Sequence, residues 1–171
     1  MLGGCCCAHI GAIEALSARY DRLALVWLDA HGDLNTPQTS PSGNPWGMPL
    51  RMVLDAGAVA PQDTALVGAR SLDPGERDFI AASGLHTGAD AVELALAGAD
   101  AVYVALDADV LDTAEVASFM PEPGGLSLAE AEAVLSETAL RTPVVGVGIT
   151  GLLPEARNIR PLQQLLAALQ L

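Results

Sequence analysis

The sequence predicts an α/β protein in which a mainly parallel, doubly wound sheet lies between two layers of helices. Short apolar runs alternate with helix-like stretches along the chain, which is the pattern of a parallel sheet covered on both faces. Apolar residues make up 51% of the 171 residues, enough to bury a core. No repeat, low-complexity tract or linker divides the chain. We therefore expect residues 1–171 to form a single domain.

Four apolar runs are the expected strands: Leu23–Leu28, Ala65–Gly68, Val102–Leu106 and Val144–Ile149. The stretch Gly84–Gly88 is a shorter candidate for a fifth strand. The first four residues, "MLGG", look like the end of a strand whose beginning is absent. Two interpretations stay open: a small version of the domain, or a domain that lacks its N-terminal strands.

Six stretches are the expected helices: Gly11–Arg19, Gly47–Ala56, Asp73–Ser83, Ala89–Ala97, Ser127–Leu140 and Ile159–Leu169. The clearest helix start is Ser127, because Glu130 three residues later completes a capping box. Pro143 then separates this helix from the next strand. Helices between successive strands are what a parallel sheet requires.

Charge and cysteine content narrow the classes of protein. The net charge of −13 would repel phosphate backbones, which argues against a nucleic-acid partner. No apolar stretch is long enough to span a bilayer and no secretory signal is visible, so we expect a cytoplasmic protein without a membrane partner. The three cysteines are adjacent, Cys5–Cys7, and odd in number, which favours free thiols in a reducing compartment.

Two acidic motifs directly follow predicted strands. Asp29, His31 and Asp33 follow the first strand, and Asp107 and Asp109 follow the third. Ligands of open α/β sheets collect beyond the carboxyl ends of the strands, and alternate residues of an extended segment point the same way. The two motifs are therefore expected to converge at one edge of the sheet.

Four converging carboxylates would repel one another unless cations lie among them. One imidazole with several carboxylates suits manganese, ferrous iron or zinc, and bridging carboxylates could hold two ions about 3.5–4 Å apart. The alternative interpretation is that each motif is only a cap or turn cluster. Together, the two motifs favour a metal site.

Several stretches resemble the ureohydrolase family, and arginases more than agmatinases. "DAHGDLNTPQTSPSGNPWGMPL" is similar to the central motif of the family, and "DAD" followed by "MPEPGGL" is similar to its second metal motif. "GARSLDPGE" is similar to the arginase segment that meets the amino-acid end of the substrate. The resemblance runs from residue 3 to the C-terminus and implies an arginase-type α/β/α fold with further strands before residue 3. A sheet edge left bare promotes association, so we expect homo-oligomers.

The resemblance implies a binuclear manganese site that activates water to hydrolyse a guanidino C–N bond in a small-molecule substrate. In it, Asp29 and Asp107 would bridge two metal ions. His31 and Asp109 would complete one ion, and Asp33 would belong to the other. The candidate catalytic residues are Asp29, His31 and Asp109.

The family completes the second ion with a histidine, and Cys6 stands at that position. A helix N-terminus would favour its thiolate, and a thiolate would shift the preference from manganese towards zinc or iron. Alternatively, Cys5–Cys7 are small buried residues and one metal site is lost. His9 could substitute as a ligand, or it is a structural histidine on a helix face.

The resemblance also implies substrate contacts. Asn35, Ser42 and Asn44 fall where arginases hold the substrate carboxylate, and Asp73 and Glu76 where they address its α-amino group. The same residues could serve local structure instead, with "SGN" as a turn and Asp73 as a helix cap.

Departures from the family pattern bear on the reaction. Trp46 replaces the loop histidine that shuttles protons, and Gly151 stands where the family has the glutamate that grips the guanidinium. Ala105 and Thr113 also depart from the second motif. We expect an amidinohydrolase with altered specificity: a metal-dependent hydrolase of C–N bonds other than peptide bonds, in linear amidines or guanidino compounds. The alternatives are a metal-binding pseudoenzyme serving as a subunit or sensor, a hydrolase with a thiol-modified mononuclear site, and a nonfunctional gene fragment.

Overall fold

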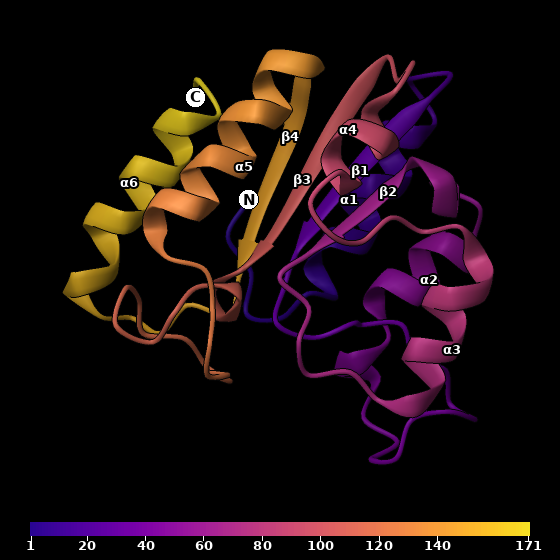
Figure 1. Cartoon of the computed structure of the whole chain (residues 1–171), viewed down its shortest axis with the longest axis horizontal. Helices are drawn as coiled ribbons and strands as arrows, with labels where there is room; N and C mark the ends of the chain where they lie inside the picture. The colour runs from indigo at the N-terminus through magenta and orange to yellow at the C-terminus, as the bar shows by residue number, and fades with distance from the viewer.

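The protein is a four-stranded parallel sheet between two layers of helices, seen in a computed structural model that describes residues 1–171 (Figure 1). The strands are β1 (Leu23–Leu28), β2 (Thr64–Val67), β3 (Ala101–Asp107) and β4 (Val144–Thr150). Their order in the sheet is β2-β1-β3-β4, and every neighbouring pair is parallel. The predicted three-layer α/β/α fold class is confirmed.

The helices are α1 (Ala8–Ser17), α2 (Pro49–Asp55), α3 (Pro74–Ser83), α4 (Ala91–Leu96), α5 (Leu128–Arg141) and α6 (Ile159–Ala168). Helices α4, α5 and α6 contribute to the core on one face of the sheet, and α1 and α2 contribute to the core on the other (Figure 1). No helix combines the length and the apolar character that a membrane crossing requires.

Alternation along the strands divides the core in two. Val26 and Val104 belong to the cluster that also holds residues of α4, α5 and α6. Trp27 and Tyr103, their neighbours in sequence, belong to the cluster under α1 and α2. Because successive side chains of a strand point to opposite faces, both strands are buried along their whole length.

The first two helices illustrate how the observed starts differ from prediction. Helix α1 begins at Ala8 rather than Gly11, because the carbonyl oxygens of Cys5 and Cys6 already accept hydrogen bonds from residues three positions later. The helix expected over Gly47–Ala56 is preceded by a separate short 3₁₀ turn, η1 (Pro45–Gly47). The side chain of Asn44 caps this turn by accepting a hydrogen bond from the Trp46 amide.

Two weak strand candidates form only isolated bridges. In the stretch Gly84–Gly88, His86 forms a single parallel bridge with Ala65, so the expected fifth strand is absent. Leu2, in the first four residues, forms a single parallel bridge with Ile149 of β4. The chain thus enters the domain alongside the edge strand β4.

Candidate metal centre

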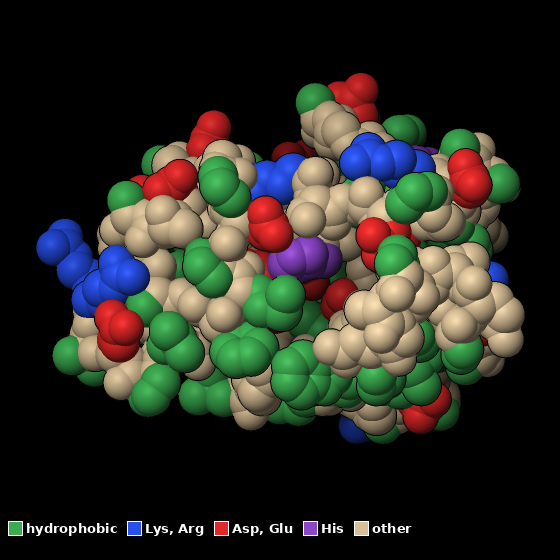
Figure 2. Space-filling model, turned by 90° about the horizontal axis from the view of Figure 1, so that it is seen from below, with side chains coloured by type: hydrophobic (Ala, Val, Ile, Leu, Met, Phe, Trp, Pro, Cys, Tyr) green, Lys and Arg blue, Asp and Glu red, His purple; other side chains and the backbone are tan.

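A cavity of about 360 Å³ opens at the carboxyl edge of the sheet, where both acidic motifs end. Figure 2 looks onto this edge and shows a histidine side chain at a hollow, with acidic side chains around and below it. All of the predicted metal ligands line the cavity: Cys6, Asp29, His31, Asp33, Asp107 and Asp109. The strand ends therefore bring the two motifs together.

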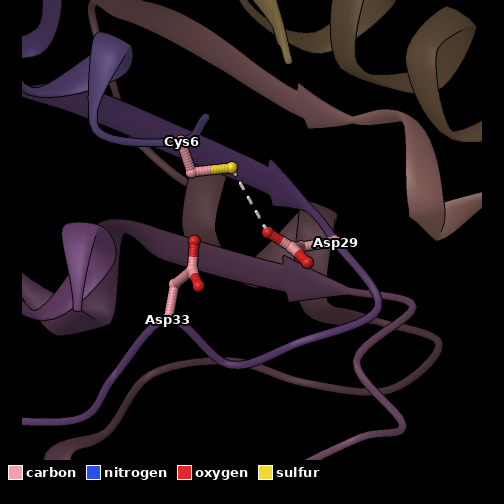
Figure 3. Close-up of side chains that lie close together, drawn as sticks. All are labelled: Cys6, Asp29 and Asp33. Carbon is pink, nitrogen blue, oxygen red and sulfur yellow. Dashed lines mark hydrogen bonds between the residues drawn. The ribbon is translucent and has the colours of Figure 1, made fainter. Parts of the chain in front are cut away.

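The first group of potential ligands is Cys6, Asp29 and Asp33. Their ligand atoms all lie within 4.8 Å of one another. Cys6 comes from the turn before α1, and Asp29 and Asp33 come from the stretch after β1 (Figure 3). The Sγ atom of Cys6 lies 3.5 Å from Oδ2 of Asp29. Asp33 has a φ of 52°, a left-handed conformation that costs a non-glycine residue roughly 1–2 kcal/mol. This strained backbone conformation occurs at the residue whose carboxylate lies beside Cys6 and Asp29.

The second group is Asp29, His31 and Asp109, again within 4.8 Å of one another. Nδ1 of His31 lies 3.4 Å from Oδ1 of Asp29 and 3.1 Å from Oδ2 of Asp109. Asp107 lies beside both groups, with Oδ2 3.1 Å from Sγ of Cys6. Because Asp29 belongs to both groups, the two groups are adjacent and share one carboxylate.

The electrostatics of the cavity fit divalent cations. Burial raises the pKa of Asp29 to about 7, and nearby carboxylates add to this rise. Burial also raises the pKa of Asp33 and of Asp107. Hydrogen bonds to Asp109 and Asp29 raise the pKa of His31 to about 11. Without a metal, protons must offset this buried negative charge, and a divalent cation at each group would do so directly.

The expectation that a helix N-terminus favours the thiolate of Cys6 is wrong for the metal-free protein. Burial raises the pKa of this thiol, and the charges of Asp29 and Asp107 raise it further. Cys6 also lies outside α1, whose N-cap is Cys7, so the helix start does not compensate. A cation bound among the carboxylates would instead lower the pKa of the Cys6 thiol, because a metal ion stabilises the thiolate form of a cysteine ligand.

His9 is a buried core histidine. Its ring makes edge contacts with Trp27 and Tyr103, with centroids 5.2 Å and 5.8 Å apart. Its Nδ1 atom lies 3.0 Å from the Tyr103 hydroxyl, and burial lowers its pKa to about 4. Gly148 makes room for the ring, because a Cβ there would overlap His9. His9 belongs to neither ligand group, which favours the structural interpretation.

The predicted substrate residues line the same cavity: Asn35, Ser42, Asn44, Asp73 and Glu76. Several of their polar atoms also serve local structure. The carboxylate of Glu76 accepts hydrogen bonds from the amides of Leu34 and Asp73, at 2.9 Å and 2.8 Å. Asn35 donates to the Asp73 carboxylate at 2.8 Å. Their position in the cavity is compatible with substrate binding, and their hydrogen bonds show that they also stabilise local structure.

Two of the family positions that differ in this chain, 46 and 151, also lie at the cavity. Trp46 is 49% exposed, and its ring meets that of Phe119 edge-on, with centroids 5.9 Å apart. Gly151 has a φ of 70°, and a Cβ at this position would overlap Oδ1 of Asp107. A carboxylate-bearing side chain is thus absent at residue 151, and the backbone leaves no space for one.

Sequence reasoning missed two residues that orient the carboxylates. Thr150 donates to Oδ2 of Asp107 at 2.9 Å, and the indole of Trp27 donates to Oδ2 of Asp29 at 3.2 Å. Thr150 is the register partner of Asp107. A polar residue at the end of the apolar strand β4 was the signal that could have found it.

Arg70 was also missed, because it bonds to backbone rather than to side chains. Its guanidinium donates to five carbonyl oxygens, those of Gly68, Asp109, Val110, Glu122 and Pro123. Its own amide donates to the carbonyl of Ala30 at 2.8 Å. Arg70 therefore ties together the segments that follow β1 and β3.

Comparison with known proteins places these features in a family. The family model described as "Arginase family" matches residues 1–168. An arginase of Staphylococcus aureus (strain COL) is 35% identical over 161 residues, which cover 79% of this chain and 53% of that protein. The chain spans about half the length of such curated relatives.

Solved structures show the same likeness. An arginase from Bacillus subtilis superimposes with a TM-score of 0.90 at 30% identity, covering 98% of this chain and 69% of that one. A proclavaminate amidino hydrolase from Streptomyces clavuligerus gives 0.81 at 26% identity, covering 98% and 61%. Both comparisons span nearly all of this chain, so the whole sheet and the loops at its carboxyl edge have counterparts in these structures.

Proposed function

The chain belongs to the arginase family, and from this premise we propose that it is a metal-dependent hydrolase of C–N bonds other than peptide bonds, acting on a linear amidine or guanidino compound. The observation that carries the proposal is the pair of ligand groups that share Asp29 at the floor of one cavity. The name of one structural relative, proclavaminate amidino hydrolase, supports amidine cleavage on this fold.

We propose that the centre takes two divalent ions, with manganese expected from the family and zinc or iron favoured at Cys6. The second group, with His31 and Asp109, would hold one ion, and the first group, with Cys6 and Asp33, would hold the other. Bound there, the ions would supply Lewis acidity, which lowers the pKa of water and offsets negative charge in the transition state.

The chain's own residues would prepare this centre. Trp27 and Thr150 each direct a hydrogen bond at a carboxylate oxygen, of Asp29 and Asp107 respectively. These bonds orient the two carboxylates, as hydrogen bonds to metal-ligating carboxylates generally do. The loops around the cavity then orient the substrate and limit access of bulk water.

The substrate would be cationic, because the cavity wall away from the ligand groups also carries the carboxylates of Asp73 and Glu76. Arginine itself would be a poor substrate. Because residue 151 is a glycine rather than a glutamate, a bound guanidinium would lack a charge-assisted hydrogen bond worth roughly 1.5–3 kcal/mol. We propose that Asn35, Ser42 and Asn44 contact the rest of the substrate from the loop that follows β1.

The second candidate is a metal-binding pseudoenzyme or sensor, and the observations that favour it are Trp46 and Gly151. The experiment is metal analysis of the purified protein together with product release from a panel of guanidino and amidino compounds. Two ions per chain with turnover of one compound, lost in Asp107→Asn, would support the hydrolase. Two ions without any turnover would support the pseudoenzyme, and no bound metal would contradict both.

The homo-oligomeric state, the cytoplasmic location and the single domain lacking N-terminal strands stay predictions. Light scattering of the purified protein tests the first, since a monodisperse monomer would contradict it.

A further inference from the structure

We propose that Glu122 is a positioning residue that holds the His31 imidazole with Nδ1 aimed at the metal centre. The inference rests on the proposed function, because it concerns how one ligand of that centre is oriented. Glu122 comes from the loop between β3 and α5 and lines the cavity. Neither the acidic spacing nor the resemblance singled it out as a site residue.

The His31 ring lies between the ligand groups and Glu122. Nδ1 lies 3.1 Å from Oδ2 of Asp109, while Nε2, on the far side of the ring, lies 3.6 Å from Oε1 of Glu122. A neutral imidazole that offers the Nδ1 lone pair to a cation carries its proton on Nε2. A carboxylate beside that N–H is the acceptor that fixes both the tautomer and the ring orientation.

Glu122 is held in place by its backbone. Arg70 donates to the carbonyl of Glu122 at 2.9 Å and to that of Pro123 at 3.0 Å. The same guanidinium donates to the carbonyl of Asp109 at 2.7 Å. One side chain therefore fixes the distance between the turn that carries Asp109 and the segment that carries Glu122.

Arg70 also fixes the third segment. Its amide and that of Ser71 donate to the carbonyl of Ala30, and Ser71 bridges His31. The three segments that carry Asp109, His31 and Glu122 thus meet at one residue. The Glu122 side chain is 34% exposed, and its Oε1 lies on the Nε2 side of the ring.

The experiment uses Co²⁺ as the probe, because its visible absorption reports ligand geometry and calorimetry gives its affinity. We expect Glu122→Ala to weaken one of the two Co²⁺ sites by about 10–100-fold and to change its absorption bands. We expect Glu122→Gln to stay close to wild type, because its amide oxygen still accepts a hydrogen bond from Nε2. Glu115→Ala, which removes the same charge from the same loop, is the matched control and should leave both sites unchanged.

Equal losses in Glu122→Ala and Glu122→Gln would overturn the proposal, because the effect would then come from charge alone. Wild-type affinity and spectrum in both variants would also overturn it, with the proposed function left standing. A wild-type protein that binds no Co²⁺ would overturn the proposed function and this inference together.

Discussion

The floor and the rim of the cavity are built in different ways. The floor consists of carboxylates at the ends of β1 and β3, and its members Asp29 and Asp107 are buried and accept hydrogen bonds from Trp27 and Thr150. The rim comes from long loops. There the side chain of Asn44 caps η1, and Trp46 is 49% exposed.

The difference suggests a division between the two regions, in which the floor determines metal binding and the rim determines substrate contact. Strand ends fix positions to within the tolerance of the sheet, which is what a metal centre needs. Loops tolerate changes of length and composition, which is how one scaffold acquires new substrates. The departure from the family pattern at Trp46, beside the retained acidic motifs, follows this division, whereas Cys6 is a departure within the floor. If the division holds, changes in the floor alter metal binding and changes in the rim do not.

The largest effect is expected for Asp29→Ala. Because Asp29 belongs to both ligand groups, its loss should weaken both ions by more than about 100-fold, beyond what the loss of a hydrogen-bonding residue behind a ligand causes. Metal stoichiometry after dialysis is the measurement, and Asp55→Ala, on the exposed end of α2, is the charge control. Retention of two ions would show that Asp29 does not bridge the two ions.

The next effect concerns the first ligand group alone. Cys6→Ala should lower the stoichiometry from two ions to one, because the group of Asp29, His31 and Asp109 stays intact. Cys6→His should restore two ions and move the preference from zinc towards manganese. Competition between the two metals measures this, with Cys7→Ala as control. Unchanged selectivity in both Cys6 variants would mean that the cysteine only packs.

A smaller effect is expected where the rim meets the floor. Gly151→Ala should lower the free energy of unfolding by about 2 kcal/mol or more, from the positive φ and from overlap with Asp107. Urea denaturation measures it. Gly43→Ala is a matched control, since Gly43 has a similar φ of 67° but open space around it. Equal losses in the two variants would show that residue 151 has room for a side chain.

The smallest effect is expected in the rim itself. Asn44→Ala should cost less than about 1 kcal/mol, because it removes the cap of a single exposed 3₁₀ turn. Metal stoichiometry should not change, whereas KM for a hydrolysed amidine should rise. A loss of metal in this variant would contradict the independence of rim and floor.

Sequence reasoning succeeded where local pattern and tertiary position agree. Strand β1 was predicted with its observed bounds, because a fully apolar run of six residues that stops at the polar stretch "DAHGD" is typical of a buried parallel strand. The convergence of Asp29 and Asp107 followed from parallel strands alone. The fifth strand failed because the apolar content of Gly84–Gly88 is too small to form more than one bridge.

What sequence reasoning missed depends on contacts between distant segments. Arg70 bonds to carbonyl oxygens about 40 and 50 positions away, and backbone acceptors leave no mark in a sequence. Glu122 acquires its role only because that arginine brings its loop to His31. The pKa of Cys6 likewise depends on burial and on carboxylates from two other segments.

The alternation that separates the two cores has a consequence for evolution. Trp27 and Tyr103 face the side of α1 and α2, and Asp29 and Asp107 continue the same odd positions to the edge where Cys6 lies. A single-residue insertion within β1 or β3 would exchange the two cores and turn the carboxylates to the opposite face. Single-residue insertions and deletions are therefore excluded from these strands. In a lineage of such proteins, length variation is expected in the segment between Asn35 and Met48, which forms the rim.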